Sequence, residues 1–200
     1  MTGTPKSEIS MKEKTIMYIN TIIVRDKRER EVTLRSAEEN DAKNLIDYLK
    51  ITAAETTFLI REPDEITLSI EQEQAFIKAR KNSENELLLI AEIDGKHIGN
   101  CSLMSAGGYK RYRHRCDIAI ALYKEYCDLG IGKAMLKTVL DIAKKIGYEQ
   151  AELEVIANNK LAIALYEKLG FKIYGTFPNN MKYADGSYAN TYWMMKKLDI

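Results

Sequence analysis

The sequence predicts a mixed α/β fold, because strand-like and helix-like patterns alternate along the chain. Short apolar runs, such as 87–91 and 118–122, have the length of buried strands. Longer segments, such as 131–146, repeat their apolar residues with the period of an amphipathic helix. In chain order these patterns give β-β-α-α-β-β-β-α-β-α-β-β.

The composition is that of an ordinary globular protein, with 46% hydrophobic and 30% charged residues, 11 glycines and 3 prolines. Its 200 residues suit one domain, which we place at 15–200 after a polar, frayed segment at 1–14. No apolar run approaches the roughly 18 residues of a membrane-spanning helix. The 30 basic and 29 acidic residues leave a net charge of +1, so we expect neither a membrane nor a nucleic acid as partner.

Cysteine and histidine are few and scattered. Cys101, Cys116 and Cys127 form no C-x-x-C pair and no even disulfide set, and no secretory signal precedes them, so we expect a reducing cytoplasm. His97 and His114 belong to no cluster with the spacing of metal ligands, so we expect no metal.

Four strands and two helices are predicted in the first half of the chain. A charged run at 25–31 separates two short strands as a turn would. Asp94-Gly95-Lys96 is a hairpin turn, since glycine readily takes a positive φ. Ser36, with Glu39 three residues later, has the spacing of a capping box at a helix start. The strands are 21–24, 32–34, 86–94 and 97–104, and the helices are 37–49 and 69–81.

In the second half of the chain, glycines mark where helices end. Gly147 and Gly170 follow amphipathic helices, Asn159 can cap the second of these, and Asp185-Gly186 forms a turn between the last two strands. The strands are 117–123, 151–156, 171–176 and 191–196, and the helices are 131–146 and 159–169.

The most informative segment is a glycine-rich turn, Gly130-Ile131-Gly132, between an apolar strand and a helix. Backbone N–H groups that no side chain shields can bind phosphate oxygens at a helix N-terminus, where the helix dipole adds to the attraction. A P-loop would need a hydroxyl where Ala134 stands, and a Rossmann fingerprint would need a glycine where Met135 stands. The turn therefore predicts a diphosphate site of another kind.

The turn resembles the acetyl-CoA signature [Q/R]-x-x-G-x-[G/A] of the GCN5-related N-acetyltransferase (GNAT) superfamily, over 127–132. A second block, N-x-x-A-I-x-L-Y-x-K-x-G-F at 159–171, is similar to that superfamily's second block and follows at the right spacing. The resemblance covers about 32–198. It implies a GNAT-like fold with a central, mixed, mostly antiparallel twisted sheet, about four helices and a splayed cofactor slot.

The same resemblance implies the activity of an N-acetyltransferase. Acetyl-CoA is the implied cosubstrate, and the acetyl group would pass directly, in a ternary complex, to a primary amine of a small molecule, an amino acid or a peptide N-terminus. A homodimer is compatible with the resemblance. The alternative is a non-catalytic acetyl-CoA-binding regulatory protein, which acceptor-dependent release of CoA would distinguish from an enzyme.

Site residues follow from the resemblance position by position. Tyr166 would be the general acid that protonates the departing thiolate. Cys127 departs from the usual Gln or Arg, which removes one phosphate contact, and the helix N-terminus would lower the pKa of its thiol. The implied cofactor-binding residues are Leu122, Tyr123, Cys127, Asp128, Leu129, Gly130, Ile131, Gly132, Lys133, Asn159 and Tyr166.

The general base and the acceptor site are less sharply indicated. Asp117 and Glu154 are the candidate bases, although strand carboxylates are more often simply solvated or paired. Similar enzymes carry acceptor-binding loops near 55–65, and Trp193 could wall the acceptor pocket. The basic run at 110–115 could contact an acidic acceptor, nucleic-acid phosphates or the 3′-phosphate of CoA, or it could be a solvated loop.

Overall fold

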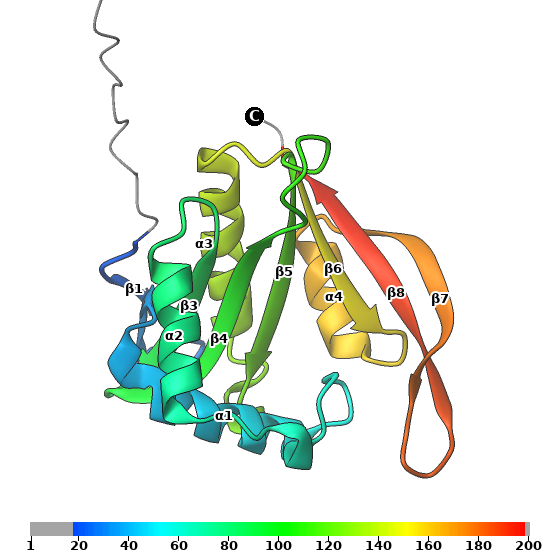
Figure 1. Cartoon of the computed structure of the whole chain (residues 1–200), viewed down its shortest axis with the longest axis horizontal. Helices are drawn as coiled ribbons and strands as arrows, with labels where there is room; N and C mark the ends of the chain where they lie inside the picture. The colour runs from blue at the N-terminus through cyan, green and yellow to red at the C-terminus, as the bar shows by residue number, and fades with distance from the viewer. Residues whose placement is uncertain (1–17, 199–200) are drawn as a thin grey trace, which may run out of the picture.

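A computed structural model describes residues 18–198, so the interpretation of 1–14 lies outside the described residues. Within that range the order of helices and strands is the predicted one (Figure 1). The strands are β1 (Ile22–Arg25), β2 (Glu31–Ser36), β3 (Leu87–Ile93), β4 (Lys96–Ser105), β5 (Arg115–Leu122), β6 (Gln150–Ile156), β7 (Lys172–Lys182) and β8 (Tyr188–Lys197). The α-helices are α1 (Ala42–Glu55), α2 (Ile70–Lys81), α3 (Ile131–Lys145) and α4 (Lys160–Lys168).

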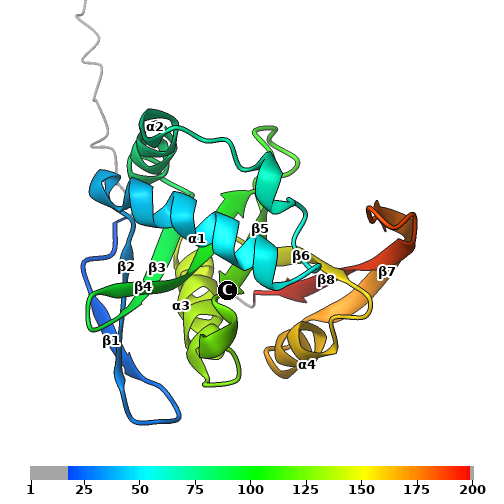
Figure 2. The same cartoon turned by 90° about the horizontal axis from the view of Figure 1, so that it is seen from below.

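The eight described strands form one sheet in the order β1-β2-β3-β4-β5-β6-β8-β7. Neighbouring strands are antiparallel except β5 and β6, which are parallel. Helices α1 and α2 cover one face, and α3 and α4 cover the other (Figure 2). The mixed, mostly antiparallel sheet and the four helices confirm the predicted fold class.

Strand alternation divides the core between the two faces of the sheet. Leu88 and Ile90 pack with Leu45 of α1 and Ile77 of α2 in a small cluster. Their neighbours, including Leu89, belong to a larger cluster on the opposite face. The larger cluster also contains the buried residues of α3, namely Ile131, Met135, Leu136, Val139, Leu140 and Ala143.

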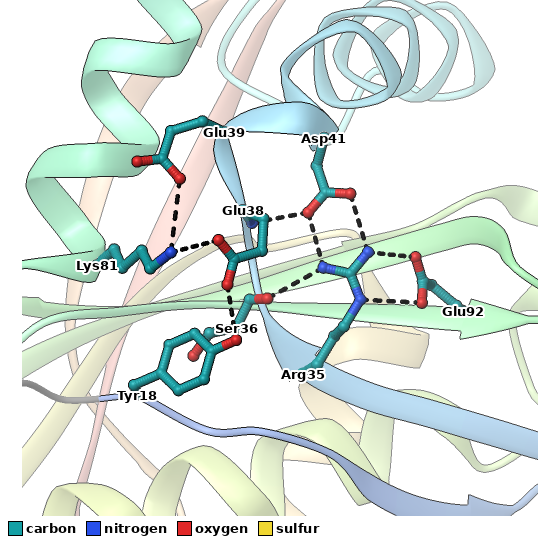
Figure 3. Close-up of polar contacts among 8 residues, drawn as sticks. All are labelled: Tyr18, Arg35, Ser36, Glu38, Glu39, Asp41, Lys81 and Glu92. Carbon is teal, nitrogen blue, oxygen red and sulfur yellow. Dashed lines mark hydrogen bonds and ion pairs between the residues drawn. The ribbon is translucent and has the colours of Figure 1, made fainter.

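A polar cluster fastens β2 to β3 and to α2 (Figure 3). The Arg35 guanidinium donates to both carboxylate oxygens of Asp41, at 2.7 and 2.9 Å, and to both of Glu92, at 2.6 and 3.1 Å. The neighbouring Glu38 carboxylate accepts from Lys81 of α2 and, at 2.6 Å, from the Tyr18 hydroxyl. Asp41 immediately precedes α1, so these paired charges hold the start of that helix against β2 and β3.

The prediction that Ser36 caps a helix starting at 37 is wrong. Ser36 ends β2, and its hydroxyl accepts from the Ile19 N–H at 3.0 Å. The chain stays extended because the Ala37 N–H donates to the Leu88 carbonyl oxygen of β3 at 2.9 Å. The capping box is instead Glu38 with Asp41, around a short 3-10 turn, and α1 follows at 42–55.

Two further predictions concern hairpins. The turn at Asp94-Gly95 is confirmed, with φ of 51° and 74°. The strand predicted at 171–176 is too short, because β7 continues to Lys182 as the edge of the sheet. Its second half is polar and irregular, with a register shift between Phe177 and Met181, and so lacks the alternation that reveals a strand.

Candidate functional site

Strands β5 and β6 separate part of the way along their length. They pair only over Arg115–Asp117 and Gln150–Glu152, beyond which they diverge (Figure 1). Past that point β5 remains paired with β4 as far as Leu122, and β6 remains paired with β8 as far as Ile156. The result is a wedge, closed at Asp117 and open at the C-terminal ends of both strands, whose two sides are strand backbone. Such an opening suits a narrow ligand chain that hydrogen-bonds to backbone.

The N-terminus of α3 lies at the open end of this wedge. Gly130 precedes the helix with φ of 85°, and Asp128 has φ of 60°. The first intrahelical bond runs from the Ala134 N–H to the Gly130 carbonyl oxygen at 3.1 Å, so the N–H groups just before Ala134 have no helical acceptor. A Cβ on Gly132 would lie 3.4 Å from Leu122 of β5. These free N–H groups and the helix dipole can bind a diphosphate beside the wedge.

Helix α4 packs beside the wedge, on the face of the sheet that also carries α3 (Figure 2). The Asn159 side chain caps α4 by accepting from the Ala162 N–H at 3.2 Å. Tyr166 is 7% exposed, and its ring lies edge-on to Phe171 at 5.9 Å between centroids. Burial raises the pKa of the Tyr166 phenol, so the hydroxyl is protonated at neutral pH.

Carboxylates line the opposite face of the sheet, toward α1 and α2. Glu152 is buried and accepts from Arg115 at 2.5 Å. Asp117 stands at the last paired position of β5, and its pKa is raised by burial and by nearby Glu152. Glu154 lies two residues beyond the last paired position of β6, so it borders the wedge, and its carboxylate accepts from Asn180. Asp117 and Glu154 therefore lie on the same face of the sheet, next to the wedge.

An aromatic wall, which we define as Tyr174, Phe177 and Trp193, stands beside Glu154. Trp193 is the cross-strand partner of Glu154, and its ring lies 6.1 Å from Tyr174 and 6.3 Å from Phe177. All three side chains are exposed. The sequence pattern indicated only Trp193, because Tyr174 and Phe177 come from a strand whose pairing is irregular.

The loop after α1 contacts both sides of the wedge's open end. The Tyr183 hydroxyl of the β7–β8 hairpin donates to the Thr57 carbonyl oxygen at 3.4 Å. The Glu55 carboxylate accepts from the Lys124 N–H at 2.7 Å, which ties the end of α1 to the segment after β5. The predicted loops near 55–65 thus lie next to the wedge.

Two details of the predicted site differ in the structure. Partial burial and the nearby Asp128 raise the pKa of the Cys127 thiol, so the expected lowering is wrong. The basic run at 110–115 leads into the start of β5, whereas the turn at Gly130 follows the other end of that strand. Eight strand residues separate the two by about 25 Å. Lys110, Arg111, Arg113 and His114 instead line a separate surface hollow of about 560 Å³, so the structure does not support their contact with the 3′-phosphate.

Within residues 18–198, no helix is long and apolar enough to cross a membrane. The same residues contain no group of three or more His, Cys, Asp or Glu side chains placed to hold a metal ion.

Comparisons with known proteins define the family. The model of the Acetyltransferase (GNAT) family matches residues 47–171, which is more than half of the chain. A solved GNAT-family acetyltransferase from Streptococcus pneumoniae superposes with a TM-score of 0.80 at 31% identity, over 84% of this chain and 99% of that one. The chain therefore belongs to the GNAT acetyltransferase family.

Individual relatives have different acceptors. The L-amino acid N-acetyltransferase AaaT of Escherichia coli (strain K12) is 29% identical over 111 residues, which are 54% of this chain and 66% of that protein. An N-alpha-acetyltransferase of Sulfurisphaera tokodaii is 32% identical over 108 residues, 50% of this chain and 64% of that protein. The chain thus spans just under two thirds of each of these relatives. The structure of yncA from Salmonella typhimurium with its cofactor acetyl-CoA shares the fold, with a TM-score of 0.75 at 19% identity over 84% of this chain and 95% of that one.

Proposed function

We propose that this protein is an acetyl-CoA-dependent N-acetyltransferase that acetylates a primary amine by direct transfer. The observation that carries the proposal is the wedge between β5 and β6, with free N–H groups of α3 at its open end. Family membership supports the acetyl-CoA assignment, and the named activities of the relatives support an amine acceptor.

The residues around the wedge fit acetyl-CoA. The turn at 128–130 and the N–H groups of Ile131, Gly132 and Lys133 bind the diphosphate. The unpaired edge of β5 up to Leu122 and Tyr123 hydrogen-bonds to the pantetheine arm, and Asn159 holds the start of α4 beside it. Bound in this way, acetyl-CoA supplies an acetyl thioester near Asp117 and Glu154.

In the reaction, the amine nitrogen bonds to the acetyl carbonyl carbon and the carbon–sulfur bond breaks. Tyr166, which is protonated at neutral pH, donates its phenolic proton to the departing thiolate, and the second proton that the nitrogen loses as the amide forms regenerates the phenol. A carboxylate removes the proton from the incoming ammonium, directly or through water. Glu154 is favoured over Asp117 for this step, because it lies beyond the last paired position and borders the wedge.

The acceptor meets the aromatic wall as it approaches Glu154. The exposed rings of Tyr174, Phe177 and Trp193 offer apolar area to an acceptor that carries an apolar group beside its amine. Peptide N-termini and amino acids with apolar side chains both meet this description, in keeping with the two kinds of relative.

The test is release of free thiol from acetyl-CoA across amino acids, peptides, polyamines and simple amines, with a reaction lacking acceptor as control. Acceptor-dependent release would establish the transferase and its acceptor class. Binding of acetyl-CoA in calorimetry without turnover of any acceptor would favour the regulatory protein instead. No binding of acetyl-CoA would refute the assignment of the wedge.

A further inference from the structure

The acetyl-CoA signature of this chain lacks the side chain that commonly assists its backbone N–H groups. Cys127 stands at the Gln or Arg position, and its Sγ lies 3.7 Å from the Tyr123 carbonyl oxygen. A thiol offers a diphosphate neither a charge nor a strong donor. A cationic side chain from another part of the chain could therefore supply the missing contact with the diphosphate.

The turn between β1 and β2 reaches the site from about 100 residues earlier in the sequence. Asp26, which is 4% exposed, shapes this turn. Its carboxylate accepts from the Arg28 N–H at 2.8 Å, from the Arg30 N–H at 3.0 Å and from Arg30 Nε at 2.8 Å. The Arg30 guanidinium also lies over the ring of Tyr126, 5.6 Å from its centroid. The turn is thus fixed internally and also against the segment that leads into the signature.

Lys27 is the residue of this turn that meets the phosphate-binding backbone. Its N–H donates to the Leu129 carbonyl oxygen at 2.9 Å. Its Cγ lies 3.7 Å from where a Cβ on Gly130 would be. Lys27 is exposed, and it forms no ion pair within the described residues. The aliphatic stem therefore lies against the turn, and the ammonium is free to bind an anion there.

We propose that Lys27 is a diphosphate-binding residue of the acetyl-CoA site, supplied by the β1–β2 turn in place of the missing side chain at Cys127. The proposal rests on the proposed function. A single ammonium–phosphate contact in a partly exposed site contributes enough to change affinity about tenfold. Because salt screens this contact, it also makes the affinity fall more steeply as the salt concentration rises.

Titration calorimetry with CoA and with 3′-dephospho-CoA tests this at several salt concentrations. The proteins are the full chain, Lys27→Ala, Lys27→Arg and the matched control Lys145→Ala. Lys145 is also an exposed lysine, but it ends α3, about 20 Å from the helix start. We expect Lys27→Ala to raise the Kd of both nucleotides about tenfold and to weaken the salt dependence. Lys27→Arg should restore most of the affinity, and Lys145→Ala should leave it unchanged.

Three outcomes would overturn the proposal. Unchanged affinity in Lys27→Ala would show that its ammonium does not contact the ligand. An effect seen with CoA and absent with 3′-dephospho-CoA would assign Lys27 to the 3′-phosphate instead. Failure of the unsubstituted protein to bind either nucleotide would refute the proposed function itself, and the Lys27 assignment with it.

Discussion

Gly132→Ala separates the binding role of the glycine-rich turn from a structural one. Gly132 lies in the first turn of α3, and its φ is not in the left-handed region. A methyl group there would lie 3.4 Å from Leu122 Cδ1, 3.5 Å from Leu165 Cδ2 and 3.8 Å from Ile120 Cδ1. These are near-ordinary contacts with the ends of flexible side chains, so the folded protein can accept the methyl group.

The substitution should stabilise α3 and leave the ligand site open. Alanine is favoured over glycine within a helix by up to about 1 kcal/mol, which would raise Tm by a few degrees in a chain of this size. Gly132 stands at the last position of the signature [Q/R]-x-x-G-x-[G/A], where alanine also occurs, so the methyl group should leave room for the ligand. The Kd of acetyl-CoA should therefore change less than about threefold, which corresponds to roughly 0.7 kcal/mol.

Differential scanning calorimetry measures the change in Tm, and calorimetric titration with acetyl-CoA measures the change in Kd. Gly108→Ala is the control, since a Cβ at Gly108 has no neighbour within 4 Å, and it should change neither quantity. If Gly132→Ala lowered Tm markedly, the glycine would be required for packing. If the Kd rose tenfold or more, Gly132 would not correspond to the [G/A] position of the signature, and the assigned binding mode would be wrong.

The remaining predictions concern the chemistry, the electrostatics and the acceptor. Tyr166→Phe should lower kcat at least about 100-fold with little change in acetyl-CoA affinity, since a general acid contributes 10²–10⁴-fold; an unchanged kcat would remove Tyr166 from the mechanism. The raised pKa of Asp117 means that its ionised form is disfavoured in the folded protein, so stability falls as pH rises through that pKa. Asp117→Asn should therefore stabilise the protein against urea at pH 7 and lose this advantage near pH 3, and equal effects at both pH values would contradict the reasoning. Trp193→Ala should raise KM for acceptors with apolar groups severalfold, whereas Tyr188→Ala, on the opposite face by strand alternation, should not. Equal KM values for all three proteins would exclude the aromatic wall from acceptor binding.

Local patterns were enough to predict most of the fold. The turn at Asp94-Gly95 and the helix of 131–145 depend on neighbours in sequence, and both are found. The prediction for Ser36 is wrong because its local capping pattern competes with a backbone hydrogen bond from Ala37 to Leu88, far away in sequence. A single sequence gives no sign of that competing bond.

In the candidate site, too, features set by neighbouring residues could be predicted and features set by distant contacts could not. The turn at Gly130 and the block ending at Phe171 are contiguous motifs, so they could be found in the sequence and placed on one fold. The extent of the wedge depends on where β5 and β6 stop pairing, which no contiguous pattern encodes. Lys27 could not be linked to Gly130 from the sequence, because the charged run at 25–31 has the appearance of an ordinary solvated turn.

The short parallel pairing of β5 and β6 also has a mechanical consequence. The sheet consists of a five-stranded plate and a three-stranded plate, joined along the strands by three residue pairs. Every other pair of neighbouring strands is joined by at least four residue pairs, so β5 and β6 share the shortest pairing in the sheet, and we expect the two plates to move most easily relative to each other there. A ligand that hydrogen-bonds to both strands would act as an additional strand between them and stiffen the sheet, because it would bind strand N–H and C=O groups that have no neighbouring strand.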